Sequence, residues 1–202
     1  MSFIYSFIKN IFFIFFTIFY RLKIINHDCI PVAGGVIVAA NHVSYLDPPV
    51  LGASLKRQPV YLARQGLFNI PVFRVLARAF ALPVNRGKPQ PSTIKEAVRR
   101  LRKGEMIVIF PEGGIRAEGS AQDVKRGVGM IAAMSRVPVV PAYIDGTDKA
   151  LPDGARLFRP ARIRVVFGNP IVPEQAETSK HYQEKIAEEI MDRIRQLKRQ
   201  LS

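Results

Sequence analysis

Short, continuous apolar runs recur along this chain and alternate with segments of helical length. A strand that is covered on both faces carries apolar residues at every position, whereas a half-exposed strand alternates. We therefore expect strands of a sheet that has helices on both faces. The predicted strands span residues 36–40, 60–63, 79–84, 106–110, 139–144 and 163–167, with Arg164 as the one charged interruption.

The segments between these runs predict helices. Residues 92–103 place Ile94, Val98 and Leu101 on one face, with Gly104 as a stop signal. The other predicted helices span residues 48–55, 72–78, 124–135 and 174–201, and the last has an apolar stripe made by Ile186, Ile190, Ile194 and Leu197. The pattern indicates an α/β fold with a mainly parallel or mixed sheet flanked by helices. This fold class hosts many chemistries and does not itself select one.

The N-terminal segment is dominated by phenylalanine and isoleucine, and only Lys9 and Asn10 interrupt its apolar part. A signal peptide is disfavoured because no small-residue cleavage site follows it. A transmembrane helix would place Lys9 near mid-bilayer at a cost of about 3 kcal/mol. We favour an embedded anchor, residues 1–23, in which Lys9 reaches the surface and Arg21 and Lys23 face the cytoplasmic side. Residues 24–202 would then form one domain.

The charge of the chain is strongly positive, with a formal net charge of +14. From Lys56 to Lys103 there are twelve Lys and Arg against Glu96 alone, a local net charge of +11. Such a surface requires an anionic partner: lipid headgroups, an acidic carrier protein or nucleic acid. No nucleic-acid-binding signature is visible, so we expect no nucleic acid partner. The single cysteine, Cys29, allows no intrachain disulfide.

One histidine and one aspartate lie five residues apart directly after the apolar run 36–40, in the stretch Asn41-His42-Val-Ser-Tyr-Leu-Asp47. This spacing does not stack two side chains on one helix face. Pro48 and Pro49 place the start of a helix at Asp47 or just after it, so His42 lies in the turn and the two side chains can meet. A His–carboxylate pair is suited to general base chemistry. The structural alternative is that Asp47 only caps the helix.

A second polar segment follows the predicted strand 106–110 and contains Glu112, Gly113, Ile115 and Arg116. Polar, glycine-rich sequence at the carboxyl end of a strand is typical of ligand sites in α/β sheets. The pair NHVSYLD and FPEGG resembles the PlsC-type glycerolipid acyltransferases, the lysophosphatidate acyltransferase family. Residues 82–87 and 137–146 resemble two further blocks of that family, so the resemblance covers roughly residues 35–146.

The resemblance implies roles for named residues. His42 would be the general base that deprotonates the acceptor hydroxyl, and Asp47 would fix its tautomer. Arg86, Arg116 and Lys125 would bind the acceptor phosphate. Glu112 would orient the loop or bind a glycerol hydroxyl, and Gly113 would allow close backbone approach. The family's third block usually reads FPEGTR, whereas this chain has Ile115 at the arginine position and Arg116 one residue later.

The resemblance therefore implies an O-acyltransferase of phospholipid biosynthesis at the cytoplasmic face of the membrane. It would transfer a fatty acyl group from acyl-CoA or acyl carrier protein to the sn-2 hydroxyl of 1-acyl-glycerol-3-phosphate, forming phosphatidate. No cofactor and no metal are expected, since the histidines have no companions at ligand spacing. Three alternatives stay open: another lysophospholipid or a lyso-aminolipid as acceptor, an acyl-serine hydrolase using Ser44, and a catalytically silent lipid-binding protein.

Overall fold

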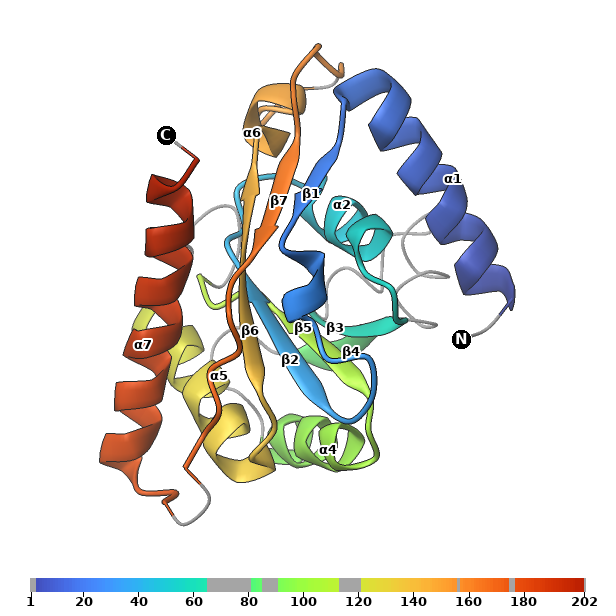
Figure 1. Ribbon diagram of the computed structural model, residues 1–202. Coiled ribbons are helices and arrows are strands. Elements are labelled where there is room, and N and C mark those ends of the chain that lie inside the picture. Colours follow the sequence, from blue (N-terminus) through green and yellow to red (C-terminus); the bar gives the residue numbers. More distant parts are fainter. Residues whose placement is uncertain are drawn as a thin grey trace.

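The fold is a twisted seven-stranded sheet with helices on both faces (Figure 1). The computed structural model describes residues 3–64, 81–84, 91–112, 121–155, 157–174 and 177–201. Within them the strand order is β1-β7-β6-β2-β5-β3-β4. The strands are β1 (Lys23–Ile25), β2 (Val36–Ala40), β3 (Pro59–Arg64), β4 (Ala81–Val84), β5 (Met106–Ile109), β6 (Val139–Asp145) and β7 (Arg164–Phe167).

The sheet is mixed. Strand β2 is central and pairs in parallel with β5 and β6, so the carboxyl ends of all three meet at one edge. Strand β7 pairs antiparallel with β6 and parallel with β1. The helices within the described residues are α1 (Phe3–Tyr20), η1 (His27–Cys29), α2 (Asp47–Ser54), α4 (Pro91–Arg102), α5 (Ala121–Ser135), α6 (Thr147–Ala150) and α7 (Lys180–Arg199).

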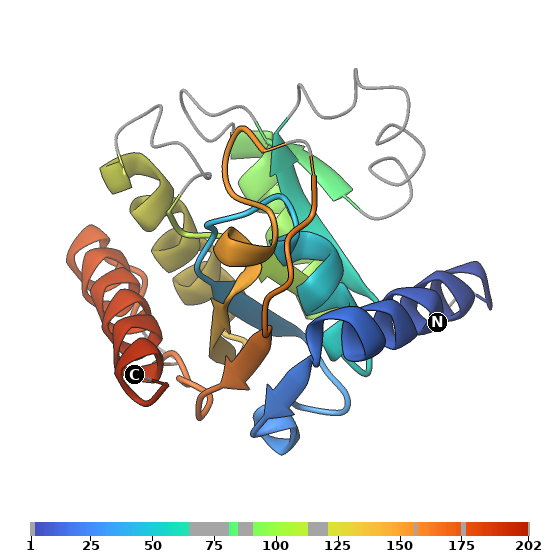
Figure 2. The same ribbon diagram turned by 90° about the horizontal axis from the view of Figure 1, so that it is seen from above.

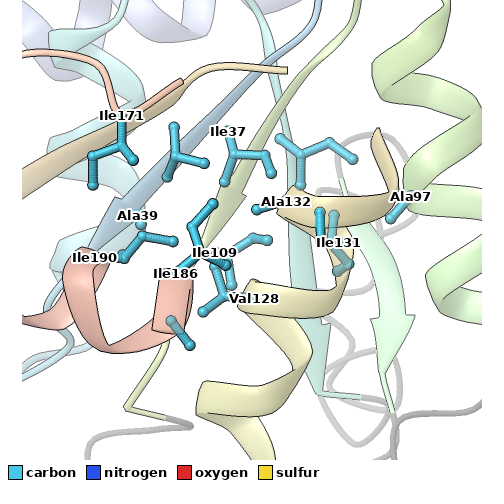
Figure 3. Close-up of a cluster of buried hydrophobic side chains, with 14 of the residues drawn as sticks. Ile37, Ala39, Ala97, Ile109, Val128, Ile131, Ala132, Ile171, Ile186 and Ile190 are labelled. Atoms are coloured by element: carbon cyan, nitrogen blue, oxygen red, sulfur yellow. The ribbon is translucent and has the colours of Figure 1, made fainter. Parts of the chain in front are cut away.

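Strand β2 shows why both faces of the sheet are covered. All five of its residues are buried, and they divide between two cores. Ile37 and Ala39 face the core that α4, α5 and α7 form, which Figure 3 shows. Val36, Val38 and Ala40 face the core beneath α1 and α2. Viewed from above, the two groups of helices lie on opposite sides of the sheet (Figure 2).

Most of the predicted elements are confirmed. The strand predicted at residues 36–40 coincides with β2, and the stripe on α7 packs against the core. Three elements were missed: β1 and η1 lie where a connector was expected, and α6 follows β6. The last helix begins at Lys180, not at residue 174, because the Ser179 hydroxyl accepts a hydrogen bond from the Tyr182 N–H and caps it there. The helix predicted at residues 72–78 and the start of the strand predicted at 79–84 lie outside the described residues.

Helix α1 has two different faces. Tyr5, Phe16 and Tyr20 are buried against the domain, and the Tyr5 hydroxyl donates to the Gly52 carbonyl of α2 at 3.2 Å. The helix is also apolar and long enough to cross a membrane by length and composition. Its other face leaves large apolar side chains exposed, namely Phe3, Ile4, Phe7, Ile11, Phe13, Ile14, Ile18 and Phe19.

Helices α5 and α7 approach closely at Gly129. A Cβ atom added there would collide with the Gln183 carbonyl oxygen and touch the Ala187 methyl. In an open helix, Gly→Ala stabilises by about 0.5–1 kcal/mol. Here we expect Gly129→Ala to lower the free energy of unfolding by about 2 kcal/mol, because the helices must separate. Urea denaturation checks the sign, and a more stable variant would contradict this packing.

Candidate active site

The carboxylate of Asp47 is the centre of the site, and it is fully buried at the first turn of α2. Its Oδ2 accepts hydrogen bonds from His42 Nδ1 at 2.9 Å and from the backbone N–H groups of Val43 and Ser44 at 2.7 and 2.8 Å. Its Oδ1 accepts from the Thr147 hydroxyl at 2.6 Å. A buried carboxylate must be paired and hydrogen-bonded to be tolerated. Four donors meet that requirement and confirm the predicted contact between His42 and Asp47.

The imidazole of His42 is held on two sides. The Asp47 carboxylate is an acceptor, so Nδ1 carries the proton and Nε2 presents a lone pair. The ring stacks on Phe110, with centroids 4.4 Å apart and planes 24° apart. Its side chain is 16% exposed, and no other described residue hydrogen-bonds Nε2. The arrangement therefore presents one oriented basic nitrogen on a partly exposed ring.

Glu112 lies just after β5 and joins that strand to the histidine turn. Its Oε2 accepts a hydrogen bond from the backbone N–H of His42 at 2.9 Å. Glu112 thus contacts the backbone of His42, and Asp47 contacts the ring of the same residue. Of the two roles expected for Glu112, this contact supports orientation of the loop.

Asn41 joins the histidine turn to β6, which lies on the opposite side of β2 from β5. Its Nδ2 donates to the Ile144 carbonyl at 2.9 Å, and its Oδ1 accepts from the Ile144 N–H at 2.7 Å. The side-chain amide thereby replaces a backbone partner at the point where the ladder between β2 and β6 ends. Asn41 is buried, so neither group of Ile144 has water as an alternative partner.

Ser44 is engaged in structure. Its hydroxyl donates to the Leu151 carbonyl at 3.1 Å and accepts from the Leu46 N–H at 3.3 Å. The residue is buried. A serine nucleophile needs an accessible hydroxyl that donates to its base. The contacts of Ser44 therefore disfavour the acyl-serine alternative.

Tyr143 of β6 carries a phenol whose pKa is affected by the carboxylate of Glu112 and by two other nearby carboxylates. Burial raises the pKa of the Tyr143 phenol, and the negative charges of Asp145, Asp148 and Glu112 act in the same direction. The phenol thus stays protonated at neutral pH. Among the described residues, no three His, Cys, Asp or Glu side chains gather as a metal ion would require.

The structure brings together His42, Asp47 and Glu112 of the predicted site. Arg86, Gly113 and Arg116 lie outside the described residues, and Lys125 falls within α5 without a described side chain. Sequence reasoning missed Asn41, Phe110 and Thr147 as members of the site. The signal for Thr147 was its position, a polar residue three positions after the strand predicted at 139–144, at the same sheet edge as His42.

Comparison with known proteins places this chain in a family. The sequence model of the family described as Acyltransferase matches residues 21–145. The chain belongs to this acyltransferase family. The match includes His42, Asp47 and Glu112, whereas Thr147 lies just beyond it.

The acyltransferase is similar to curated relatives and to a solved structure. It is 30% identical over 203 residues to 1-acyl-sn-glycerol-3-phosphate acyltransferase of Bacillus subtilis (strain 168), covering 98% of each chain. It is 30% identical over 164 residues to the chloroplastic 1-acyl-sn-glycerol-3-phosphate acyltransferase BAT2 of Brassica napus, covering 79% of this chain but 47% of that one. The crystal structure of the 1-acyl-sn-glycerophosphate (LPA) acyltransferase PlsC from Thermotoga maritima superposes with a TM-score of 0.77 at 26% identity, over 96% of this chain and 79% of that one.

We expect Asn41→Asp to destabilise the acyltransferase by about 2 kcal/mol at neutral pH, because a carboxylate then faces the Ile144 carbonyl with no donor. At low pH the protonated carboxyl can donate to that carbonyl, so the deficit shrinks. Denaturant titrations at several pH values measure this. The exposed Asn169 gives the control, since Asn169→Asp keeps its acceptor oxygen and should change stability by less than about 0.5 kcal/mol. Equal deficits for both variants at all pH values would contradict the role of Asn41.

Proposed function

We propose that this acyltransferase transfers a fatty acyl group to the sn-2 hydroxyl of 1-acyl-glycerol-3-phosphate, forming phosphatidate for phospholipid biosynthesis. The observation that carries the proposal is the contact of His42 Nδ1 with the buried Asp47 carboxylate, which leaves Nε2 as an oriented base. The names of the similar proteins from Bacillus subtilis, Brassica napus and Thermotoga maritima support the acceptor. The donor is a thioester, either acyl-CoA or acyl carrier protein, and no cofactor takes part.

In the proposed mechanism, His42 Nε2 takes the proton of the acceptor hydroxyl as its oxygen attacks the thioester carbonyl. Asp47 keeps the imidazole in the required tautomer and stabilises the imidazolium that forms. The tetrahedral intermediate collapses, the carbon–sulfur bond breaks, and the imidazolium returns the proton to the thiolate. No covalent enzyme intermediate is needed, in keeping with the structural contacts of Ser44.

Phosphate recognition in this proposal belongs to Arg86, Arg116 and Lys125, with Gly113 providing close backbone approach. An arginine fork matches the oxygens of a phosphate. Ile115 stands where the family usually has arginine, and Arg116 follows it. This shift is the specific observation that favours the second candidate, an acceptor with a different headgroup such as another lysophospholipid or a lyso-aminolipid.

The two faces of α1 support a helix that lies in the cytoplasmic leaflet of the membrane. Tyr5 and Tyr20 both contact the domain although they lie near opposite ends of α1. A helix that crossed the bilayer would have to leave the domain along most of its length, breaking these contacts. A helix that lies in the interface keeps them and buries its exposed phenylalanine and isoleucine side chains in lipid.

We expect His42→Ala to lower turnover of lysophosphatidate by about 10³-fold or more, because the general base is lost. The measurement is acyl transfer by purified protein in mixed micelles, with acyl-CoA and acyl carrier protein offered separately. His181 supplies a matched control: it is exposed on α7, so His181→Ala should retain full turnover. Vesicle binding should be the same in all three proteins.

The same assay includes a lysophospholipid with another headgroup and a lyso-aminolipid. Turnover confined to one of these acceptors, and lost in His42→Ala, would keep the mechanism and replace the acceptor. Folded wild-type protein that binds vesicles but turns over no acceptor with either donor would leave the silent lipid-binding alternative.

We expect Thr147→Val to lower kcat about tenfold with little change in KM, because Asp47 loses one of its four donors and holds His42 less firmly. Thr147→Ser keeps the hydroxyl and should retain most of the activity. Both variants lose contacts in a buried site, so both can lower the melting temperature. Thermal unfolding of each variant therefore shows whether a loss of kcat follows from lost stability or from lost positioning of Asp47. If Thr147→Ser lost as much kcat as Thr147→Val, the hydroxyl would have no positioning role.

A further inference from the structure

The segment between α6 and β7 carries two consecutive exposed apolar side chains, and it begins at Leu151, whose carbonyl contacts the histidine turn. Leu157 is 79% exposed and Phe158 is 59% exposed. The segment rises past the carboxyl ends of β2 and β6, at the upper end of the molecule in Figure 1. Tyr45, in the turn between His42 and Asp47, is also exposed. Adjacent large apolar side chains that face water mark an interaction surface.

Positive charge borders this apolar pair. Arg159 and Arg162 are both exposed, and among the described residues neither is paired with a carboxylate. Apolar side chains next to unpaired arginines suit the boundary between anionic headgroups and acyl chains. A surface for a neutral apolar partner would gain nothing from these charges.

The segment is fixed at both of its ends. At the start, the Leu151 carbonyl accepts from the Ser44 hydroxyl, and the Arg159 N–H donates to the Ala150 carbonyl at 2.8 Å. At its end, the N–H of the buried Ile163 donates to the carbonyl of Tyr20 at 3.0 Å.

These hydrogen bonds attach the exposed pair to the histidine turn on one side and to the end of α1 on the other. Ile18 and Phe19, next to Tyr20, are exposed as well. The last turn of α1 and the segment 151–162 thus reach the same end of the molecule (Figure 1). A lipid leaflet that receives the exposed face of α1 would therefore also contact the segment 151–162.

We propose that residues 151–162 form a second contact with an anionic lipid leaflet, in which Leu157 and Phe158 insert at the end of the sheet where the histidine turn lies. This inference rests on the proposed placement of α1 in the leaflet and extends it to the catalytic end of the sheet. Its consequence is that the acceptor hydroxyl and Nε2 of His42 meet at the leaflet surface.

The chain contains no tryptophan, so one substitution gives a site-specific probe. In Phe158→Trp, the new indole should show blue-shifted emission with phosphatidylglycerol vesicles and strong quenching when their acyl chains are brominated. Val172 gives the matched control: it is 69% exposed but follows Ile171, which pairs with Val139 at the amino end of β6. The emission of Val172→Trp should change with neither kind of vesicle.

A second pair of variants measures the contribution to binding. The double variant Leu157→Ser and Phe158→Ser should weaken vesicle partitioning by about tenfold or more, because two apolar side chains no longer enter lipid. Val32→Ser with Val172→Ser removes equally exposed apolar groups at the opposite end of the sheet and should leave partitioning unchanged.

Three outcomes would overturn the proposal, and they differ from one another. If Phe158→Trp co-sediments with vesicles but its emission does not change, the second contact does not exist and α1 alone anchors the protein. Absence of co-sedimentation for every variant would remove the leaflet placement itself. An indole that responds to acyl carrier protein in solution, and not to vesicles, would make this segment a protein-docking surface.

Discussion

The buried carboxylate of Asp47 is the interaction on which the site depends. An ionised carboxylate out of contact with water is stable only when donors surround it. Two of its donors come from the backbone of the histidine turn, one from His42 itself, and one from Thr147, which lies one hundred residues later. One charge therefore shapes the turn, orients the imidazole and joins α2 to α6. Asn41 and Glu112 then attach the same turn to β6 and β5.

Helix α2 connects this site to the apolar surface of the protein. Asp47 is its first residue, and the Tyr61 hydroxyl donates to the Pro48 carbonyl at 2.9 Å. One turn later, the Gly52 carbonyl accepts from Tyr5 of α1. A Cβ at Gly52 would press on the Tyr61 hydroxyl, so the close approach of these groups needs glycine there. Helix α1 is thus part of the packing around the histidine turn as well as the source of the exposed apolar face.

The sequence predicted the elements whose signal is local. Strand β2 is apolar at every position because both of its faces are covered, and the prolines after Asp47 marked the start of α2. The contact of His42 with Asp47 followed from these two boundaries. Thr147 was not predictable in the same way, because nothing local links it to a carboxylate one hundred residues away. Strand β1 was missed because Lys23–Ile25 is short and is defined only by its pairing with the distant β7.

A base that deprotonates an alcohol also deprotonates water, so an enzyme that uses the proposed mechanism must limit hydrolysis of its thioester donor. Phe110 covers one face of the His42 ring, and Asp47 occupies Nδ1, so water reaches the imidazole mainly at the Nε2 side. On the proposed placement, the leaflet faces that end of the sheet, with α1 and residues 151–162 in contact with lipid. The lysolipid acceptor then arrives from a phase that is poor in water and rich in substrate. Selectivity for the alcohol over water would then come from the position of the site at the leaflet, in addition to the groups that line the site.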